Sequence, residues 1–149
     1  MIPLPPPMRA ALDAARAAAD KGEVPVGAVV MLDGRMVAVA ANAPRALHDP
    51  TAHAEMLAIR QAAQALGSDR LEGCDLWVTL EPCAMCAGAI AHARIERLFY
   101  GAPDPKGGAV EHGPRLFAQP TIHHRPELYA GIGEGEAAAL LRAFFAERR

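Results

Sequence analysis

The chain has 149 residues, a length that suits one globular domain, so we expect a single domain over residues 1–149. Its 15 basic and 17 acidic residues give a formal net charge of −2. This balance excludes a strongly basic nucleic-acid coat protein, which needs a large positive field, but it is compatible with a small local patch. The sequence contains no apolar run of about 18 residues, so we expect no membrane span. Three cysteines are too few for a disulfide framework and indicate a reducing, cytoplasmic compartment.

Helical and strand-like patterns alternate along the chain. In order, we expect a helix over 8–21, strands over 24–32 and 36–40, a helix over 52–66, a strand over 76–80, a helix over 83–93, strands over 95–100 and 123–129, and a helix over 134–148. This alternation predicts an α/β sheet with helices on both faces. A hairpin between the first two strands makes the sheet mixed, and Pro126 favours an edge position for the last strand.

Residues with special backbone preferences mark the expected ends of these elements. Gly22 and Gly67 are expected to end the first two helices, and Thr51 is the candidate N-cap of the second. Asp33-Gly34 is typical of the tight turn in a hairpin. Two prolines suit the first helical position, where an N–H group has no partner in any case: Pro7 for the first helix and Pro82 for the third.

A histidine and two cysteines have the character of zinc ligands. Cys83 and Cys86 are three residues apart at the start of an expected helix, so both sulfurs lie on one face and near a helix N-terminus that stabilises thiolates. Thiolates together with the imidazole of His53 select zinc over magnesium or calcium. Three protein ligands leave the fourth position for water, as in catalytic zinc sites.

Cys74 offers an alternative, because a fourth protein ligand would close the site and make it structural. Cys74 precedes the strand over 76–80, however, whereas Cys83 follows it. Five strand residues span about 16 Å, so we expect Cys74 at the opposite end of the sheet, as a small buried thiol.

Glu55 is the candidate catalytic residue. It lies two positions after His53, a spacing that is poor for one helical face, and in most helices such a carboxylate is simply solvated. Beside a zinc ligand at a helix start, it becomes a candidate to accept the proton of a metal-activated water.

The motifs His-x-Glu at residues 53–55 and Pro-Cys-x-x-Cys at residues 82–86 form the known signature of zinc-dependent deaminases of the cytidine deaminase superfamily. Beyond these motifs, the sequence resembles bacterial tRNA-specific adenosine deaminases over nearly its whole length. The segments that carry this resemblance are residues 24–28, Asn42, residues 48–55, residues 79–90 and residues 101–109.

The resemblance implies a three-layer α/β/α sandwich around a central five-stranded mixed sheet, and a homodimer. It implies hydrolytic deamination of the wobble adenosine to inosine in a tRNA anticodon stem-loop by zinc-activated water. One zinc ion per chain would be held by His53, Cys83 and Cys86, and Glu55 would move the protons.

The resemblance also implies contacts to RNA. Asn42 would bind the flipped nucleotide, and Asp104 and Lys106 would lie near its ribose and phosphates. The last helix would approach the anticodon loop with Phe144, Phe145, Arg148 and Arg149.

Most of these candidate RNA-binding residues also have a purely structural interpretation. Asn42 often forms turns, Lys106 would be a solvated charge in most chains, Phe144 and Phe145 fit an apolar helix face, and the last two arginines suit a frayed end.

Two other functions stay open. One is a deaminase of a free nucleobase or nucleoside such as guanine or cytosine, which the acidic balance and the residues Glu111-His112 after the glycine-rich loop favour. The other is a non-catalytic zinc-binding module, for which Glu55 would be dispensable.

Overall fold

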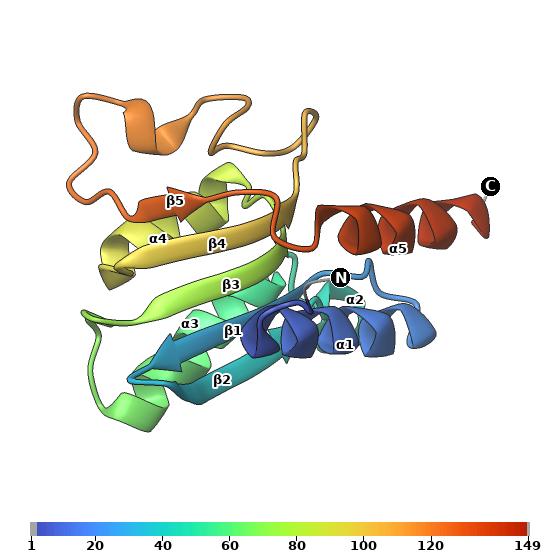
Figure 1. Cartoon of the computed structure of the whole chain (residues 1–149), viewed down its shortest axis with the longest axis horizontal. Coiled ribbons are helices and arrows are strands. Elements are labelled where there is room, and N and C mark those ends of the chain that lie inside the picture. The colour runs from blue at the N-terminus through green and yellow to red at the C-terminus, as the bar shows by residue number, and fades with distance from the viewer. Residues whose placement is uncertain (1–2, 149) are drawn as a thin grey trace.

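The computed structural model describes residues 3–148 (Figure 1). Its helices are α1 (Pro6–Asp20), α2 (Pro44–Leu47), α3 (Ala54–Leu66), α4 (Ala84–Ala93), the 3-10 turn η1 (Leu116–Ala118) and α5 (Glu134–Ala146). Its strands are β1 (Gly27–Leu32), β2 (Arg35–Ala41), β3 (Asp75–Leu80), β4 (Arg97–Ala102) and β5 (Glu127–Tyr129). Among the described residues, no helix is both long and apolar enough to cross a membrane.

The five strands form one mixed sheet in the order β2-β1-β3-β4-β5 (Figure 1). β1 pairs antiparallel with β2 and β3, whereas β3, β4 and β5 run parallel. The predicted fold class is therefore confirmed. Because β3 and β4 are parallel, their carboxyl ends meet at one edge of the sheet, and the segments that follow them lie close together there.

Helices pack on both faces of the sheet and bury alternate strand residues in two separate cores. On one face, Val29 clusters with Met8 of α1. On the other face, Val30 clusters with Ala58 of α3 and Ile90 of α4. This alternation follows from the two-residue period of a strand, and it produces the three layers expected.

Two helices begin one or two residues later than predicted, which places metal-ligand candidates at N-caps. The N-cap of α3 is His53 and not Thr51, because Thr51 instead bonds to Asp49 Oδ1 through both its N–H and its hydroxyl, at 2.8 and 2.7 Å. The N-cap of α4 is Cys83, so Pro82 precedes the helix and does not occupy its first turn. His53 and Cys83 both have extended backbone, with ψ of 152° and 176°.

Other boundaries differ for local reasons. β4 begins at Arg97 and not at residue 95, because the N–H of Ile95 still bonds to a carbonyl of α4. β5 is shorter than the expected strand over 123–129 and lies at the edge of the sheet, as Pro126 predicts. The expected ends at Gly22 and Gly67 are confirmed, since both glycines have positive φ.

Candidate active site

Three sulfur and nitrogen ligands converge where α3 and α4 begin. Nδ1 of His53 lies 3.6 Å from Sγ of Cys83 and 3.6 Å from Sγ of Cys86. All three ligand atoms lie within 4.8 Å of one another. Among residues 3–148, no other group of three such side chains meets this criterion.

These separations fit a tetrahedral zinc ion. Zinc bonds to sulfur at about 2.3 Å and to nitrogen at about 2.05 Å, so tetrahedral angles place the two ligand atoms about 3.6 Å apart. Cys86 is buried, whereas His53 and Cys83 are partly exposed, so the group is closed on one side and open toward solvent on the other. Such a site holds the ion firmly and leaves a position for water.

Cys83 and Cys74 lie in different environments, which shift the pKa values of their thiols in opposite directions. The hydrogen bond from the Cys86 thiol lowers the pKa of Cys83 to about 5, so Cys83 is a ready thiolate. Cys74, in contrast, lies at the start of β3, and burial raises the pKa of its thiol. It is absent from the ligand group, which confirms its interpretation as a buried structural thiol.

Glu55 lies in the first turn of α3 and its residue surface is only 4% exposed. Burial raises the pKa of its carboxyl to about 7. A backbone hydrogen bond opposes this shift, and the charge of Cys83 adds to it. The carboxyl lines the same cavity as the ligands His53 and Cys83. A carboxyl near neutrality suits both the acceptance and the return of a proton.

A cavity of about 340 Å³ adjoins the ligand group and is lined by His53, Glu55 and Cys83. Asn42 and Asp104 line the same cavity, which we call the catalytic cavity. Oδ1 of Asn42 accepts a hydrogen bond from the N–H of Ala54 at 2.8 Å, at the N-terminus of α3. This bond orients the Asn42 amide, whose NH₂ group is then the donor that remains for a ligand.

A second cavity, of about 670 Å³, continues from the first toward α5 and is lined by Lys106 and Phe145. We call it the Phe145 cavity. The residues that line both cavities are Val24, Leu80, Asp104 and Gly107. Phe145 is 49% exposed, so an aromatic side chain and the cationic Lys106 line the same cavity.

A third cavity, of about 230 Å³, continues in another direction and is lined by Arg45, Phe144 and Arg148. We call it the Arg148 cavity, and the three cavities together the groove. Asn42 belongs to both the Arg148 cavity and the catalytic cavity. The guanidinium of Arg148 lies 3.5 Å from the ring centroid of Phe144, which is buried, so Phe144 is a packing residue. Arg149 lies outside the described residues.

Sequence reasoning gave no role to Glu81, although it is one of four buried charged or polar residues within the described range 3–148. It accepts hydrogen bonds from the N–H of Asp104 and from His112. Burial alone would raise the pKa of Glu81, but these bonds and others from backbone N–H groups outweigh it and lower the pKa. The sequence feature that could have identified Glu81 is its position directly between a buried strand and the Pro82-Cys83 turn. A carboxylate buried there must accept several hydrogen bonds.

The fold and the ligand group together define a zinc-binding deaminase domain. The family model described as "cytidine and deoxycytidylate deaminase zinc-binding region" matches residues 6–102. The chain therefore belongs to this deaminase family, and it is a hydrolytic enzyme that acts on a carbon–nitrogen bond.

Within the family, the chain is similar to enzymes that act on tRNA. It is 59% identical to the tRNA-specific adenosine deaminase of Agrobacterium fabrum, over 95% of this chain and 93% of that protein. A solved structure from a study of A-to-I editing by tRNA:A34 deaminases at the wobble position has a TM-score of 0.90 at 58% identity, covering 91% of this chain and 98% of that one. A guanine deaminase of Bacillus subtilis is more distant, with a TM-score of 0.66 at 33% identity over 95% and 91% of the two chains.

Proposed function

We propose that this protein converts the wobble adenosine of a tRNA anticodon to inosine by hydrolysis. The observation that carries the proposal is the groove, which extends beyond the catalytic cavity in two directions. The catalytic cavity has the size for one base, whereas the Phe145 and Arg148 cavities offer an aromatic face and cationic groups. A free base needs neither of these, but the nucleotides flanking a flipped base do. The similarity to tRNA-specific adenosine deaminases supports the same substrate.

The chemistry exchanges the 6-amino group of adenine for oxygen, with water consumed and ammonia released. His53, Cys83 and Cys86 would hold a zinc ion, which when bound would lower the pKa of a water molecule. Glu55 accepts a proton from that water and passes it to ring atom N1 as the oxygen bonds to C6. It then transfers the second proton of the water to the departing amino group. Each proton returns to the substrate, so Glu55 ends the cycle in its starting state.

The surrounding residues bind and orient the nucleotide. The NH₂ group of Asn42 donates to the flipped nucleoside, in line with its fixed orientation at the α3 N-terminus. Asp104 and Lys106 contact its ribose and a phosphate, while Phe145 stacks on a neighbouring base and Arg148 neutralises a second phosphate. Each of these side chains lines the groove.

The free-base alternative rests on the similarity to guanine deaminase and on the acidic Glu111. The structure weakens the second reason. The carboxylate of Glu111 accepts the hydroxyl hydrogen of buried Tyr100 and lines none of the three cavities, so it does not repel a phosphate there.

A substrate panel distinguishes the two functions. We expect the zinc-loaded protein to form inosine in an anticodon stem-loop with adenosine at the wobble position, and to leave guanine, cytosine and free adenosine essentially unchanged. Measurable turnover of a free base, with none of the stem-loop, would establish the alternative. A stem-loop with guanosine at the wobble position is the matched control.

We further infer a homodimer in the cytoplasm and one domain over residues 1–149. The compartment is supported by the cysteines, which form no disulfide among the described residues, and the dimer by the family resemblance. Sedimentation at micromolar concentration tests the dimer, and a single cooperative unfolding transition tests the single domain.

A further inference from the structure

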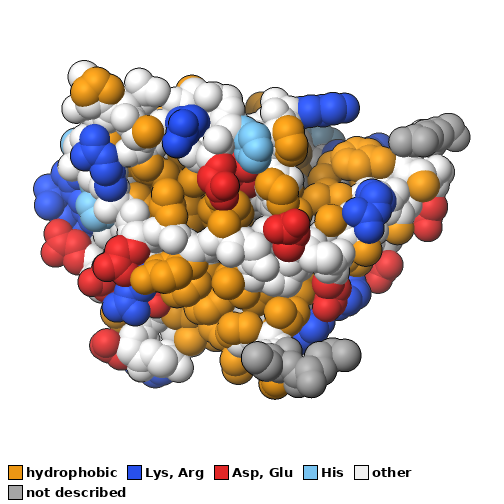
Figure 2. All heavy atoms as spheres, turned by 45° about the horizontal axis from the view of Figure 1, so that its top comes forward, with side chains coloured by type: hydrophobic (Ala, Val, Ile, Leu, Met, Phe, Trp, Pro, Cys, Tyr) orange, Lys and Arg blue, Asp and Glu red, His pale blue; other side chains and the backbone are white. Residues whose placement is uncertain are grey.

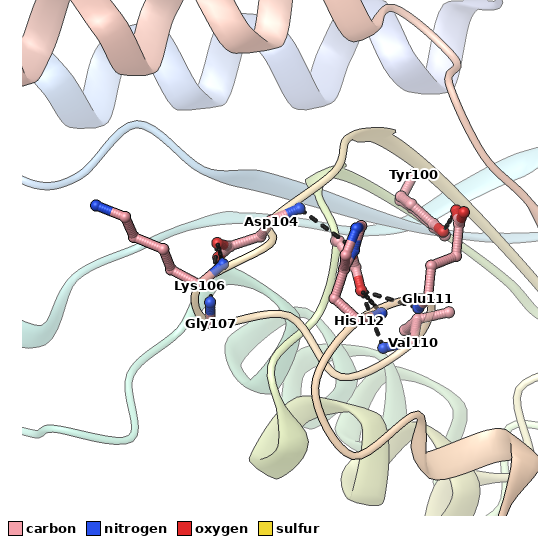
Figure 3. Close-up of polar contacts among 8 residues, drawn as sticks. Tyr100, Asp104, Lys106, Gly107, Val110, Glu111 and His112 are labelled. Atoms are coloured by element: carbon pink, nitrogen blue, oxygen red, sulfur yellow. Dashed lines mark hydrogen bonds and ion pairs between the residues drawn. The ribbon is translucent and has the colours of Figure 1, made fainter.

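Glu81 links the metal-binding helix to one wall of the groove. It directly follows β3, it precedes Pro82-Cys83, and it is 2% exposed. Its carboxylate accepts five hydrogen bonds, and every donor belongs to the loop over residues 104–112 (Figure 3). We call this segment the wall loop.

The five bonds use both carboxylate oxygens. Oε1 accepts from the N–H of Asp104 at 3.0 Å and from Nδ1 of His112 at 2.7 Å. Oε2 accepts from three consecutive N–H groups, those of Val110, Glu111 and His112, at 2.9 to 3.1 Å. An ionised carboxylate has about four lone-pair sites, so this one is saturated. Only a carboxylate accepts at both positions, because an amide must present a donor at one of them.

The wall loop is shaped around this carboxylate. A Cβ at Gly108 would lie 2.5 Å from the Glu81 carboxyl carbon, so glycine is required where the loop passes it. The N–H of Ala109 donates to the carbonyl of Pro82 at 2.9 Å. Tyr100 on β4 donates to the carboxylate of Glu111, as Figure 3 shows at the other end of the segment. A displaced loop would leave the buried N–H of Val110 and the partly buried N–H groups of Asp104, Glu111 and His112 without these partners.

The same loop presents the groups that face the groove. Asp104 and Gly107 line the catalytic cavity, and Lys106 lines the Phe145 cavity. Figure 3 shows the side chain of Lys106 directed away from the bonded cluster. Asp104 Oδ1 also accepts from the N–H groups of Lys106 and Gly107, at 3.2 and 2.9 Å, so the position of Asp104 sets that of Lys106.

We infer that Glu81 is a positioning residue for the substrate: through the wall loop, it holds Asp104 and Lys106 at the groove. This inference rests on the proposed function, because it takes the groove as the binding site for the stem-loop. Glu81 also lines the catalytic cavity, but hydrogen bonds from the wall loop occupy both of its carboxylate oxygens, so we infer that it acts on the substrate through that loop.

The variant Glu81→Gln should distinguish the hydrogen bonds to Oε1 of Glu81 from those to Oε2. The amide oxygen will take the position that faces three N–H groups, which leaves the NH₂ group opposite the N–H of Asp104 and Nδ1 of His112. The imidazole can change its tautomer and accept from the NH₂ group, whereas the N–H of Asp104 cannot. Two donors then face each other, so the Asp104 end of the wall loop is released while residues 110–112 stay bound. We expect KM for the stem-loop to rise about tenfold, kcat to stay within about twofold, and the zinc content to be unchanged. Glu72→Gln, at an exposed carboxylate, is the matched control and should leave all three quantities unchanged.

A double-mutant cycle with Asp104→Ala tests whether Glu81 acts through Asp104. We expect the two substitutions to be strongly non-additive in KM, since the second removes the group that the first misplaces. Additive effects on KM, or an effect of Glu81→Gln on kcat or zinc content alone, would overturn the inference.

Hydrogen exchange gives a readout that does not depend on activity. In Glu81→Gln, the backbone amides of Asp104 and of residues 106–109 should exchange faster than in the wild type, whereas those of α4 should not change. If the wild type fails to deaminate the stem-loop, the proposed function is wrong. The exchange pattern then still tests whether Glu81 holds the wall loop in place. If the wild type is active and Glu81→Gln changes neither KM nor exchange, the inference about Glu81 is wrong.

Discussion

Glu55 reaches the metal ligands because His53 is not part of the helix that carries Glu55. Within a helix, side chains two positions apart point about 200° away from each other. A spacing of two residues would therefore not place His53 and Glu55 on one helical face. His53, however, is an N-cap with extended backbone, and α3 begins at Ala54. The helical angle therefore does not apply between the two side chains, and both line one cavity.

The variant Glu55→Gln should retain zinc but lose turnover. The amide keeps the shape of the side chain but cannot accept a proton from water, so we expect kcat to fall by at least about a thousandfold. Metal analysis together with inosine formation measures both properties. Retention of near wild-type deamination would exclude Glu55 as the proton carrier, and a non-catalytic zinc module predicts that every function survives the change.

At the residue scale, motif spacing predicted the ligands His53, Cys83 and Cys86 but missed Glu81. The ligands belong to short motifs whose chemistry is visible in the residue types. Glu81 depends on N–H groups that follow it by more than 20 residues, and backbone donors leave no trace in the sequence. The expectation that Thr51 caps a helix was wrong. Its hydroxyl and its N–H bond to the side chain of Asp49 instead.

Between the helices α1 and α5, one carboxylate adds an ion cluster to the apolar packing of Met8 and Leu12 with Ala137. Glu136 of α5 accepts hydrogen bonds from Arg9 at 2.6 and 3.0 Å, and it also pairs with Arg16. The hydrogen bond from Arg9 is the main reason that the pKa of Glu136 is lowered to about 2 from its ordinary value of 4.5. This cluster adds to the apolar packing that holds α5, whose Phe145 lines the groove, against α1.

This contact predicts an acid-dependent loss of stability. Because the pKa of Glu136 is lower in the folded protein, its contribution is complete above about pH 4.5 and disappears as the pH falls toward 2. Glu136→Gln should therefore destabilise the protein by about 1 kcal/mol at neutral pH and by much less near pH 2. Denaturant unfolding of both proteins across this range measures the difference, with Glu134→Gln on the same helix as the control. A difference that does not change with pH would contradict the assignment.

The bounds of the long helices were predicted within a few residues, whereas those of the shortest elements were not. The helices α1, α3 and α5 each span several turns, so their apolar spacing is visible in the sequence. α2 has four residues and β5 has three, too few to show a period. α2 is instead held by tertiary contact, since buried Glu23 accepts the N–H groups of Arg45 and Ala46 at its start.

At the scale of the whole molecule, the net charge of −2 does not oppose RNA binding but limits its form. Figure 2 shows basic, acidic and apolar side chains interspersed on the visible face, with no continuous basic surface. Around the groove, the lining cations are Arg45, Lys106 and Arg148. RNA contact should therefore rest on a few local groups and on stacking.

This arrangement predicts a shallow dependence of binding on salt. Three phosphate contacts to a single-stranded loop give a slope of about −2 for the logarithm of the binding constant against the logarithm of salt concentration. Titration of the Glu55→Gln variant with a stem-loop measures this slope without turnover. A slope steeper than about −5 would show that many more cations contact the RNA than those in the groove.

Hydrolysis at a single nucleotide of the tRNA can be followed by the oxygen that it introduces. The zinc-loaded protein is incubated with full-length tRNA bearing adenosine at the wobble position, in water labelled with heavy oxygen, and each nucleoside is then located and weighed by mass spectrometry. We expect inosine at the wobble position alone, with the labelled oxygen at C6 and one ammonia released per inosine. No inosine from a fully metallated sample, inosine at other positions, or inosine without the label would contradict it.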